Sequence, residues 1–237
     1  MTTILFDLYG TLVSYSKSRT EQGFPRSAAV LARAGCRFGY DEWLATWDSV
    51  AEAMDVQADE TGVEVSMSEV FASFAPVVGF DPTDEHYDAL ATEFLGCYVD
   101  EWSSVVRLVD GVPDMLGRLA VAGHRNVLVS NTHDSAMVGR HLDSFGILPH
   151  LDHVVTSVDL GWRKPRPEIY TAALEPFGTS PGDAVFVGDT YVADYVGPTS
   201  VGIEAYLIVP DGAPLPDGLP ADRRLASVLD LEARLDR

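Results

Sequence analysis

Cysteine and long apolar runs are both scarce in this chain of 237 residues. Its two cysteines, Cys36 and Cys97, are too few for a disulfide framework. No run approaches the roughly 18 apolar residues that span a bilayer, and the first residues lack the basic start and apolar core of a secretion signal. We therefore expect a cytoplasmic protein with free thiols and no membrane partner.

Lysine is also scarce. Lys17 and Lys164 are the only two lysines, so arginine supplies nearly all of the 16 basic residues. Against 36 acidic residues this gives a formal net charge of −20 at pH 7, which should repel nucleic acid. So large a negative charge favours a halophilic protein, adapted to high salt. An ordinary acidic protein from an arginine-preferring genome is the alternative.

The hydrophobic content of 46% is ample for a folded core. Five short apolar runs have the length and composition of buried strands. These runs cover residues 3–8, 125–130, 153–156, 184–188 and 205–209. Helical patterns alternate with them, at 112–122, 136–145 and 167–177 and from 191 onward. The alternation predicts an α/β fold, a doubly wound parallel sheet of Rossmann-like type, over residues 1–15 and 103–237.

Residues 16–102 contain no run that resembles a buried parallel strand, so we expect an inserted all-helical domain. The predicted helices cover 27–34, 41–54, 67–76 and 84–98, and we expect Asp41 to cap the second of them. The acidic stretch 55–62 is predicted to be a linker. In the last helix, Phe94 and Tyr98 belong to an apolar face at helical spacing, which favours a role in the core.

Polar residues stand at the ends of the predicted strands and ahead of a proline-initiated helix. They are Asp7 with Gly10 and Thr11, Ser130 with Asn131, Lys164, and Asp189 with Asp194. In open α/β sheets, ligands bind outside the carboxyl ends of the strands. We therefore expect these groups to meet in one crevice.

Three carboxylates and one lysine cannot share a crevice without a further cation. Mg²⁺ suits a site of one or two carboxylates with water and a substrate phosphate, so the set predicts a Mg²⁺ cofactor beside Asp7, Asp189 and Asp194. Asp7 is then placed to attack phosphorus as a carboxylate nucleophile. Ser130, the amide of Asn131 and the ammonium of Lys164 would bind the phosphoryl oxygens.

In their order along the chain, four motifs resemble those of the haloacid dehalogenase-like hydrolase superfamily. They are Asp7-Leu8-Tyr9-Gly10-Thr11, Ser130-Asn131, Lys164-Pro165, and Gly188-Asp189 with Asp194. The resemblance implies that Asp7 is the nucleophile, that Lys164 holds charge, and that Asp189 and Asp194 surround the metal.

The resemblance adds the backbone carbonyl of Tyr9 as a metal ligand and makes residues 16–102 a helical cap over the active site. It also implies a small-molecule substrate, with Tyr9 and Gly10 as candidate substrate-binding residues and Thr11 among the catalytic ones.

Tyr9 departs from the common phosphatase pattern, in which this position is a second aspartate that donates a proton to the leaving alcohol. Loss of a general acid typically costs about 10²–10⁴-fold in rate, and a tyrosine with a pKa of about 10 is a poor substitute. His133 is another candidate donor. We therefore favour a Mg²⁺-dependent phosphatase acting on a small phosphorylated metabolite with a good leaving group, such as an acyl or aryl phosphate.

Two other functions remain open. The first motif, with its tyrosine, also resembles the L-2-haloacid dehalogenase branch, whose aspartate attacks carbon without a metal. That branch uses a cap arginine, for which Arg26, Arg33 and Arg37 are candidates, and it usually lacks the Gly188-Asp189 pair. A non-catalytic binding protein on the same scaffold is the third possibility. We expect a monomer or a homodimer.

The charge predicts how salt affects stability. If the protein is halophilic, its melting temperature should rise by several degrees between 0.1 M and 3 M KCl, because screening weakens the repulsion among the acidic residues. In a chain of this size, about 1 kcal/mol of stability shifts the melting temperature by about 2–4 °C. Thermal unfolding followed by circular dichroism measures the effect. A melting temperature that is independent of KCl would favour the ordinary acidic protein.

Overall fold

The computed structural model describes residues 1–16 and 22–235 of the chain. They form two compact units, one made of Met1–Tyr15 with Arg107–Arg237 and the other of Ser16–Val106. Within the described residues, no helix has the length and apolar character needed to cross a membrane.

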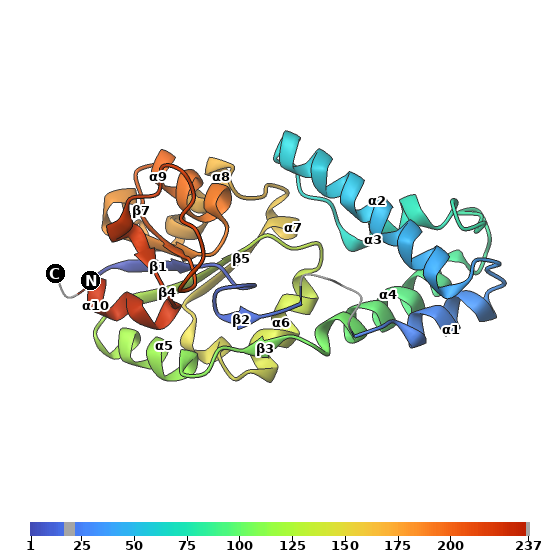
Figure 1. Ribbon diagram of the computed structural model, residues 1–237, viewed down its shortest axis with the longest axis horizontal. Helices are drawn as coiled ribbons and strands as arrows, with labels where there is room; N and C mark the ends of the chain where they lie inside the picture. The colour runs from blue at the N-terminus through green and yellow to red at the C-terminus, as the bar shows by residue number, and fades with distance from the viewer. Residues whose placement is uncertain (17–21, 236–237) are drawn as a thin grey trace. The chain divides into compact units, whose positions relative to one another are not determined.

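The first unit contains a six-stranded parallel sheet in the order β5-β4-β1-β6-β7-β8 (Figure 1). The strands are β1 Thr3–Phe6, β4 Arg125–Ser130, β5 His153–Thr156, β6 Ala184–Gly188, β7 Glu204–Ile208 and β8 Arg224–Leu225. The chain builds outward from β1 through β4 to β5, and then continues on the other side of β1 with β6. This change of direction places a topological switch point at β1, between β4 and β6, where open α/β sheets bind their ligands.

Helices lie on both faces of this sheet, with α8 and α9 on one side and α5 and α6 on the other (Figure 1). The α-helices of this unit are α5 Val112–Val121, α6 Ser135–Ser144, α7 Ser157–Leu160, α8 Pro167–Leu174, α9 Gly197–Ser200 and α10 Glu232–Leu235. A π-helix, η4, covers Tyr191–Val196, and short 3₁₀ turns are η1 Leu148–His150, η2 Glu175–Phe177, η3 Pro181–Asp183, η5 Ala221–Arg223 and η6 Val228–Leu231. The predicted doubly wound fold is confirmed.

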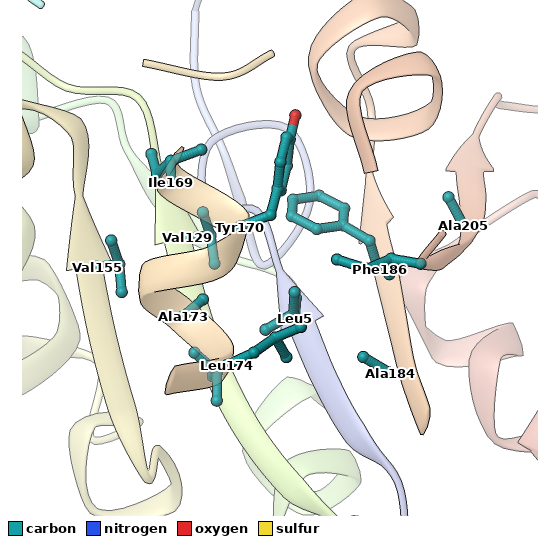
Figure 2. Close-up of a cluster of buried hydrophobic side chains, with 12 residues drawn as sticks. Leu5, Val129, Val155, Ile169, Tyr170, Ala173, Leu174, Ala184, Phe186 and Ala205 are labelled. Carbon is teal, nitrogen blue, oxygen red and sulfur yellow. The ribbon is translucent and has the colours of Figure 1, made fainter. Parts of the chain in front are cut away.

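The core between α8 and the sheet fixes the positions of the central strands (Figure 2). From α8, Ile169, Tyr170 and Ala173 pack against residues of several neighbouring strands, all of them buried. The strand residues include Leu5, Val127, Val129, Val155, Phe186 and Ala205. Val127 and Val129 are two residues apart and therefore face the same side of β4. Because this packing joins β1, β4, β5, β6 and β7 under one helix, the strand ends are held in a fixed register.

The second unit is helical, with α1 Pro25–Arg33, α2 Tyr40–Thr61, α3 Met67–Phe74 and α4 Tyr87–Ser103. Aromatic side chains dominate its core: Trp47 contacts Phe74, Phe94 and Tyr98 with ring centroids 4.7–5.2 Å apart. Phe94 and Tyr98 are buried as their helical spacing predicted.

Two predictions for this unit are wrong. Residues 55–61 continue α2 instead of forming a linker. Ala58 in this segment is buried, and the helix ends only at Gly62, which has a φ of 74°. The cap of α2 is Gly39, whose N–H donates to the carboxylate of Glu42 at 3.3 Å, so Asp41 does not cap the helix. Asp41 lies in the first helical turn, where its negative charge suits the helix dipole.

The sequence analysis missed several short elements. β2 Val13–Ser14 and β3 Arg107–Leu108 form an antiparallel pair where the chain leaves the first unit and re-enters it. Neither β2, β3 nor β8 is longer than two residues, which is too short to produce an apolar pattern. The first strand ends at Phe6 instead of Leu8, and α8 ends at Leu174, where η2 takes over ahead of Gly178.

Candidate active site

Asp7 follows β1 directly and lies at the switch point of the sheet. Its backbone N–H donates to the carbonyl of Val187 on β6 at 2.9 Å, which ties the end of one strand to its neighbour. Its side chain is buried, with a residue exposure of 7%. Gly10 turns the chain with a φ of 96°, and a Cβ there would overlap the carboxylate of Asp189. Glycine is therefore required for the turn after Asp7 to approach Asp189 so closely.

Lys164 lies between two carboxylates. Its Nζ is 2.7 Å from Asp7 Oδ1 and 2.7 Å from Asp194 Oδ1, and the residue is 3% exposed. Burial disfavours the charged ammonium, but the carboxylates of Asp194 and Asp7 raise the pKa of Lys164 above its usual value. Lys164 is therefore a permanent cation at neutral pH.

The loop that carries Lys164 is held by Asn131, which follows β4. The side-chain oxygen of Asn131 accepts the backbone N–H of Lys164 at 2.8 Å, and its side-chain nitrogen donates to the carbonyl of Lys164 at 3.0 Å. The side chain of Asn131 thus positions Lys164. Ser130, at the end of β4, is fully buried, and its hydroxyl lies 3.4 Å from the carbonyl of Asn131, at the long limit for a hydrogen bond.

Asp194 is carried by η4 and is 1% exposed. Besides the ion pair with Lys164, its Oδ2 accepts the backbone N–H of Thr190 at 2.8 Å. A Cβ at Gly188 would overlap the carboxylate of Asp194, so this glycine leaves the space in which the side chain lies. Both oxygens of Asp194 therefore have fixed partners.

Asp7, Asp189 and Asp194 bring carboxylate oxygens within 4.8 Å of one another. Asp7 Oδ2 is buried and has no hydrogen-bond partner among the described residues, although Asp7 Oδ1 is paired with Lys164. An unsatisfied buried carboxylate oxygen is costly unless a cation or donor meets it. Three acids against one lysine leave an excess of two negative charges, so the residues present fit a divalent cation with oxygen ligands.

The pKa of Asp7 reflects the same excess of charge. Burial raises the pKa of Asp7 from 3.8 to about 7, with Asp194 and Asp189 adding to the rise and Lys164 opposing it. Asp7 therefore needs further positive charge to be fully ionised at neutral pH.

Thr11 is buried, and its hydroxyl has no hydrogen-bond partner among residues 1–16 and 22–235. The described contacts do not join this hydroxyl to the carboxylate cluster. Its backbone N–H donates to the carbonyl of Leu8 at 3.3 Å, which closes the turn after the nucleophile candidate.

Tyr9 contacts a residue that the sequence analysis missed. Its hydroxyl forms a 2.9 Å hydrogen bond with Nδ1 of His141 on α6, and its ring meets those of His141 and Tyr15 edge to face. Burial, followed by the charges of Asp134 and Asp7, raises the pKa of Tyr9. Burial also lowers the pKa of His141, with Arg140 acting in the same direction. His133, the donor considered from the sequence, is half-buried in the loop before α6.

The candidate arginines lie in the helical unit. Arg26 pairs with Asp100 at 3.3 Å and Arg33 pairs with Glu93 at 2.5 Å, with all four side chains more than half exposed. Arg37 is exposed. Two of the three cations offered for a substrate carboxylate therefore already have acidic partners.

A doubly wound parallel sheet with a buried acid–lysine cluster at its switch point defines an α/β protein with a charged site at the ligand-binding edge of the sheet. The chain belongs to the haloacid dehalogenase-like hydrolase family, whose model matches residues 1–202. The resemblance drawn from the four motifs is thereby confirmed.

Curated relatives include haloacid dehalogenase-like hydrolase domain-containing protein 3 of Homo sapiens, 36% identical over 55% of this chain and 52% of that protein. The matched part of this chain thus spans about half the length of that relative. The ribulose-1,5-bisphosphate 5-phosphatase of Halopiger xanaduensis is 28% identical over 88% of this chain and 85% of that protein. Among solved structures, a 2-haloacid dehalogenase from Pseudomonas syringae shares the fold with a TM-score of 0.77 and 21% identity, covering 100% of this chain and 99% of that one.

The raised pKa of Asp7 predicts a pH-dependent stability. In EDTA, the folded protein retains the Asp7 proton between about pH 4 and pH 7 while the unfolded chain releases it, so this group lowers stability progressively as the pH rises through that window. Asp7→Asn removes the titration. The free energy of unfolding of the variant, relative to wild type, should therefore increase from pH 4 to pH 7 and then level off.

Urea unfolding at several pH values measures this difference. Asp183→Asn is the matched control, since Asp183 is exposed in η3, and its difference from wild type should not follow the same curve. A difference for Asp7→Asn that does not change with pH would contradict the assignment.

Proposed function

We propose that this protein is a Mg²⁺-dependent phosphatase that hydrolyses a small phosphorylated metabolite through an aspartyl-phosphate on Asp7. The observation that carries the proposal is a cluster of three carboxylates, two buried and one half-buried, of which Lys164 pairs with two. In this cluster Asp7 Oδ2 has no hydrogen-bond partner among the described residues. A metal-free displacement at carbon would require no such excess of acids. The phosphatase names of two relatives, a ribulose-1,5-bisphosphate 5-phosphatase and a phosphoglycolate phosphatase, support the same choice.

Asp7, Asp189, Asp194 and the backbone carbonyl of Tyr9 would hold Mg²⁺. When bound, the ion would neutralise the excess negative charge and attract a phosphoryl oxygen. In the first step a carboxylate oxygen of Asp7 bonds to phosphorus as the bond from phosphorus to the leaving-group oxygen breaks. In the second step water attacks the aspartyl-phosphate, which releases phosphate and regenerates the carboxylate of Asp7.

Lys164 has two tasks in this scheme. Its ammonium orients Asp7 through Oδ1 and balances part of the negative charge that spreads over the phosphoryl oxygens. Asn131 keeps Lys164 in place through its two hydrogen bonds to the backbone of that residue. Ser130 and Thr11 complete the candidate set as hydroxyl donors to substrate oxygens.

The acidity and the hydrogen bond of the Tyr9 hydroxyl limit which leaving groups the protein can accommodate. Its raised pKa makes Tyr9 a weaker acid than an exposed tyrosine, and its hydroxyl is already engaged with His141. Substrates whose leaving group departs without a proton avoid this deficit, so we assign acyl and aryl phosphates as the preferred class. The helical unit, inserted between the first and second motifs, would act as the cap that selects among them.

L-2-haloacid dehalogenation is the second candidate, and Tyr9 is the residue that favours it, because halide also departs without a proton. Asp189 argues against it, because together with Asp194 it places two further acids beside the nucleophile. The ion pairs of Arg26 and Arg33 with Asp100 and Glu93 carry less weight, since exposed pairs contribute only about 0–1 kcal/mol.

Turnover of an aryl phosphate tests the proposal. Purified protein should release p-nitrophenol from p-nitrophenyl phosphate with Mg²⁺, and EDTA should abolish the release. Asp7→Asn should lower the rate by about 10⁴-fold or more, since a nucleophile that acts as part of a unit accounts for most of the rate enhancement. Halide release from a 2-haloacid in EDTA would instead establish the dehalogenase, and neither activity would indicate the binding protein.

Tyr9→Asp tests the assigned leaving group. An aspartate at this position supplies the missing general acid, so turnover of alkyl phosphates should rise by about 10²-fold or more relative to turnover of p-nitrophenyl phosphate. Tyr15→Asp is the control, because it places an acid near the same aromatic contact but outside the motif. An unchanged ratio of alkyl to aryl turnover in Tyr9→Asp would contradict the account of Tyr9.

A further inference from the structure

The helix that carries Asp194 is irregular. η4 is a π-helix over Tyr191–Val196, and the N–H of Gly197 continues its pattern by donating to the carbonyl of Val192, five residues earlier. In the same pattern the next N–H, from residue 198, would serve the carbonyl of Ala193. Residue 198 is a proline and has no N–H to donate. The backbone alone therefore leaves the carbonyl of Ala193 without its π-helical partner.

Tyr170 supplies the missing donor. Its hydroxyl, from α8, donates to the carbonyl of Ala193 at 2.5 Å. The residue is fully buried, and its ring meets that of Phe186 on β6 edge to face, with centroids 5.6 Å apart. Figure 2 shows the hydroxyl pointing away from the apolar cluster that holds the ring. A Cβ at Gly197 would overlap this hydroxyl, so the chain also leaves the space that Tyr170 needs.

The next residue along the chain is Asp194, whose two carboxylate oxygens accept from Lys164 Nζ and from the N–H of Thr190. These contacts require the backbone of η4 to hold one conformation. We propose that Tyr170 is a positioning residue, whose hydroxyl replaces the absent N–H of Pro198 and fixes η4 so that Asp194 faces Lys164. The expected effect of Tyr170 on Mg²⁺ affinity rests on the proposed function, whereas its expected effect on the backbone of η4 does not.

Tyr170→Phe removes only the hydroxyl and keeps the ring packed on Phe186. A single hydrogen bond contributes about 1 kcal/mol, which corresponds to about a fivefold change in an equilibrium constant. In EDTA, amide hydrogen exchange of Thr190 and of the η4 segment should therefore be about fivefold faster in the variant. The dissociation constant for Mg²⁺, measured by calorimetry, should rise by a similar factor.

Tyr206→Phe is the matched control. Tyr206 is also buried, and its hydroxyl donates to Glu204 at 2.9 Å within β7 instead of to η4. The control should leave both the exchange of Thr190 and the Mg²⁺ affinity at wild-type values.

Pro198→Ala tests whether the Tyr170 hydroxyl acts as a substitute for the missing N–H of Pro198 or only contributes to packing. The alanine restores a backbone N–H, so Pro198→Ala in the Tyr170→Phe background should return exchange and Mg²⁺ affinity toward wild type. Exchange unaffected by Tyr170→Phe would overturn the inference, and so would a defect that Pro198→Ala fails to relieve. Wild-type protein that binds no Mg²⁺ would refute the proposed function, while the exchange result in EDTA would still decide the role of Tyr170.

Discussion

The buried ion pairs of Lys164 with Asp7 and Asp194 are the interaction on which the site depends. Transfer of three charged groups from water to the protein interior costs free energy. A buried ion pair is therefore weak evidence for stability, because a protein with apolar residues of similar volume in its place is often equally stable. Removing one partner alone leaves an uncompensated buried charge and costs about 3–5 kcal/mol. The three groups therefore determine the arrangement of charge at the switch point. Gly188 leaves space for Asp194, Asn131 fixes the backbone of Lys164, and Gly10 leaves space for Asp189 beside them.

In this site the charged groups and the residue at the proton-donor position are different residues. Charge is concentrated in Asp7, Asp189, Asp194 and Lys164, all supplied by segments at the switch point of the sheet. The proton donor expected of the common phosphatases is replaced by Tyr9, whose hydroxyl is engaged with His141 on α6. Under the proposed function, the charge that would accept a phosphoryl group is retained, and the leaving groups are limited to those that depart without a proton. The first motif, with its tyrosine, resembles dehalogenases, and the fourth, with Asp189, resembles phosphatases.

Much of the core was predictable because buried parallel strands are continuous apolar runs, and three of them, 125–130, 153–156 and 184–188, have the predicted bounds. Asp7, Asp189, Asp194 and Lys164 were predicted to lie together because they stand at strand ends and helix starts, and their side chains do converge. The contact between Tyr9 and His141 joins residues 132 positions apart and leaves no local pattern. The extension of α2 was missed because the acidic composition of 55–62 was given more weight than the helix propensity of Gln57, Ala58 and Glu60.

The π-helix η4, which carries Asp194, is followed by a proline whose missing N–H leaves a backbone carbonyl without its helical partner. Pro198 removes a donor just beyond Asp194, and a regular α-helix would bond residue 197 to residue 193 instead of to Val192. A π-helical turn is wider than an α-helical one, and such turns occur frequently at functional sites. The hydroxyl of Tyr170 on α8, 23 residues earlier in the chain, donates to the buried carbonyl of Ala193 that Pro198 leaves without an N–H. The departure from regular structure is thus compensated by a buried group whose ring belongs to the core, which links the packing under α8 directly to the orientation of a charged residue in the site.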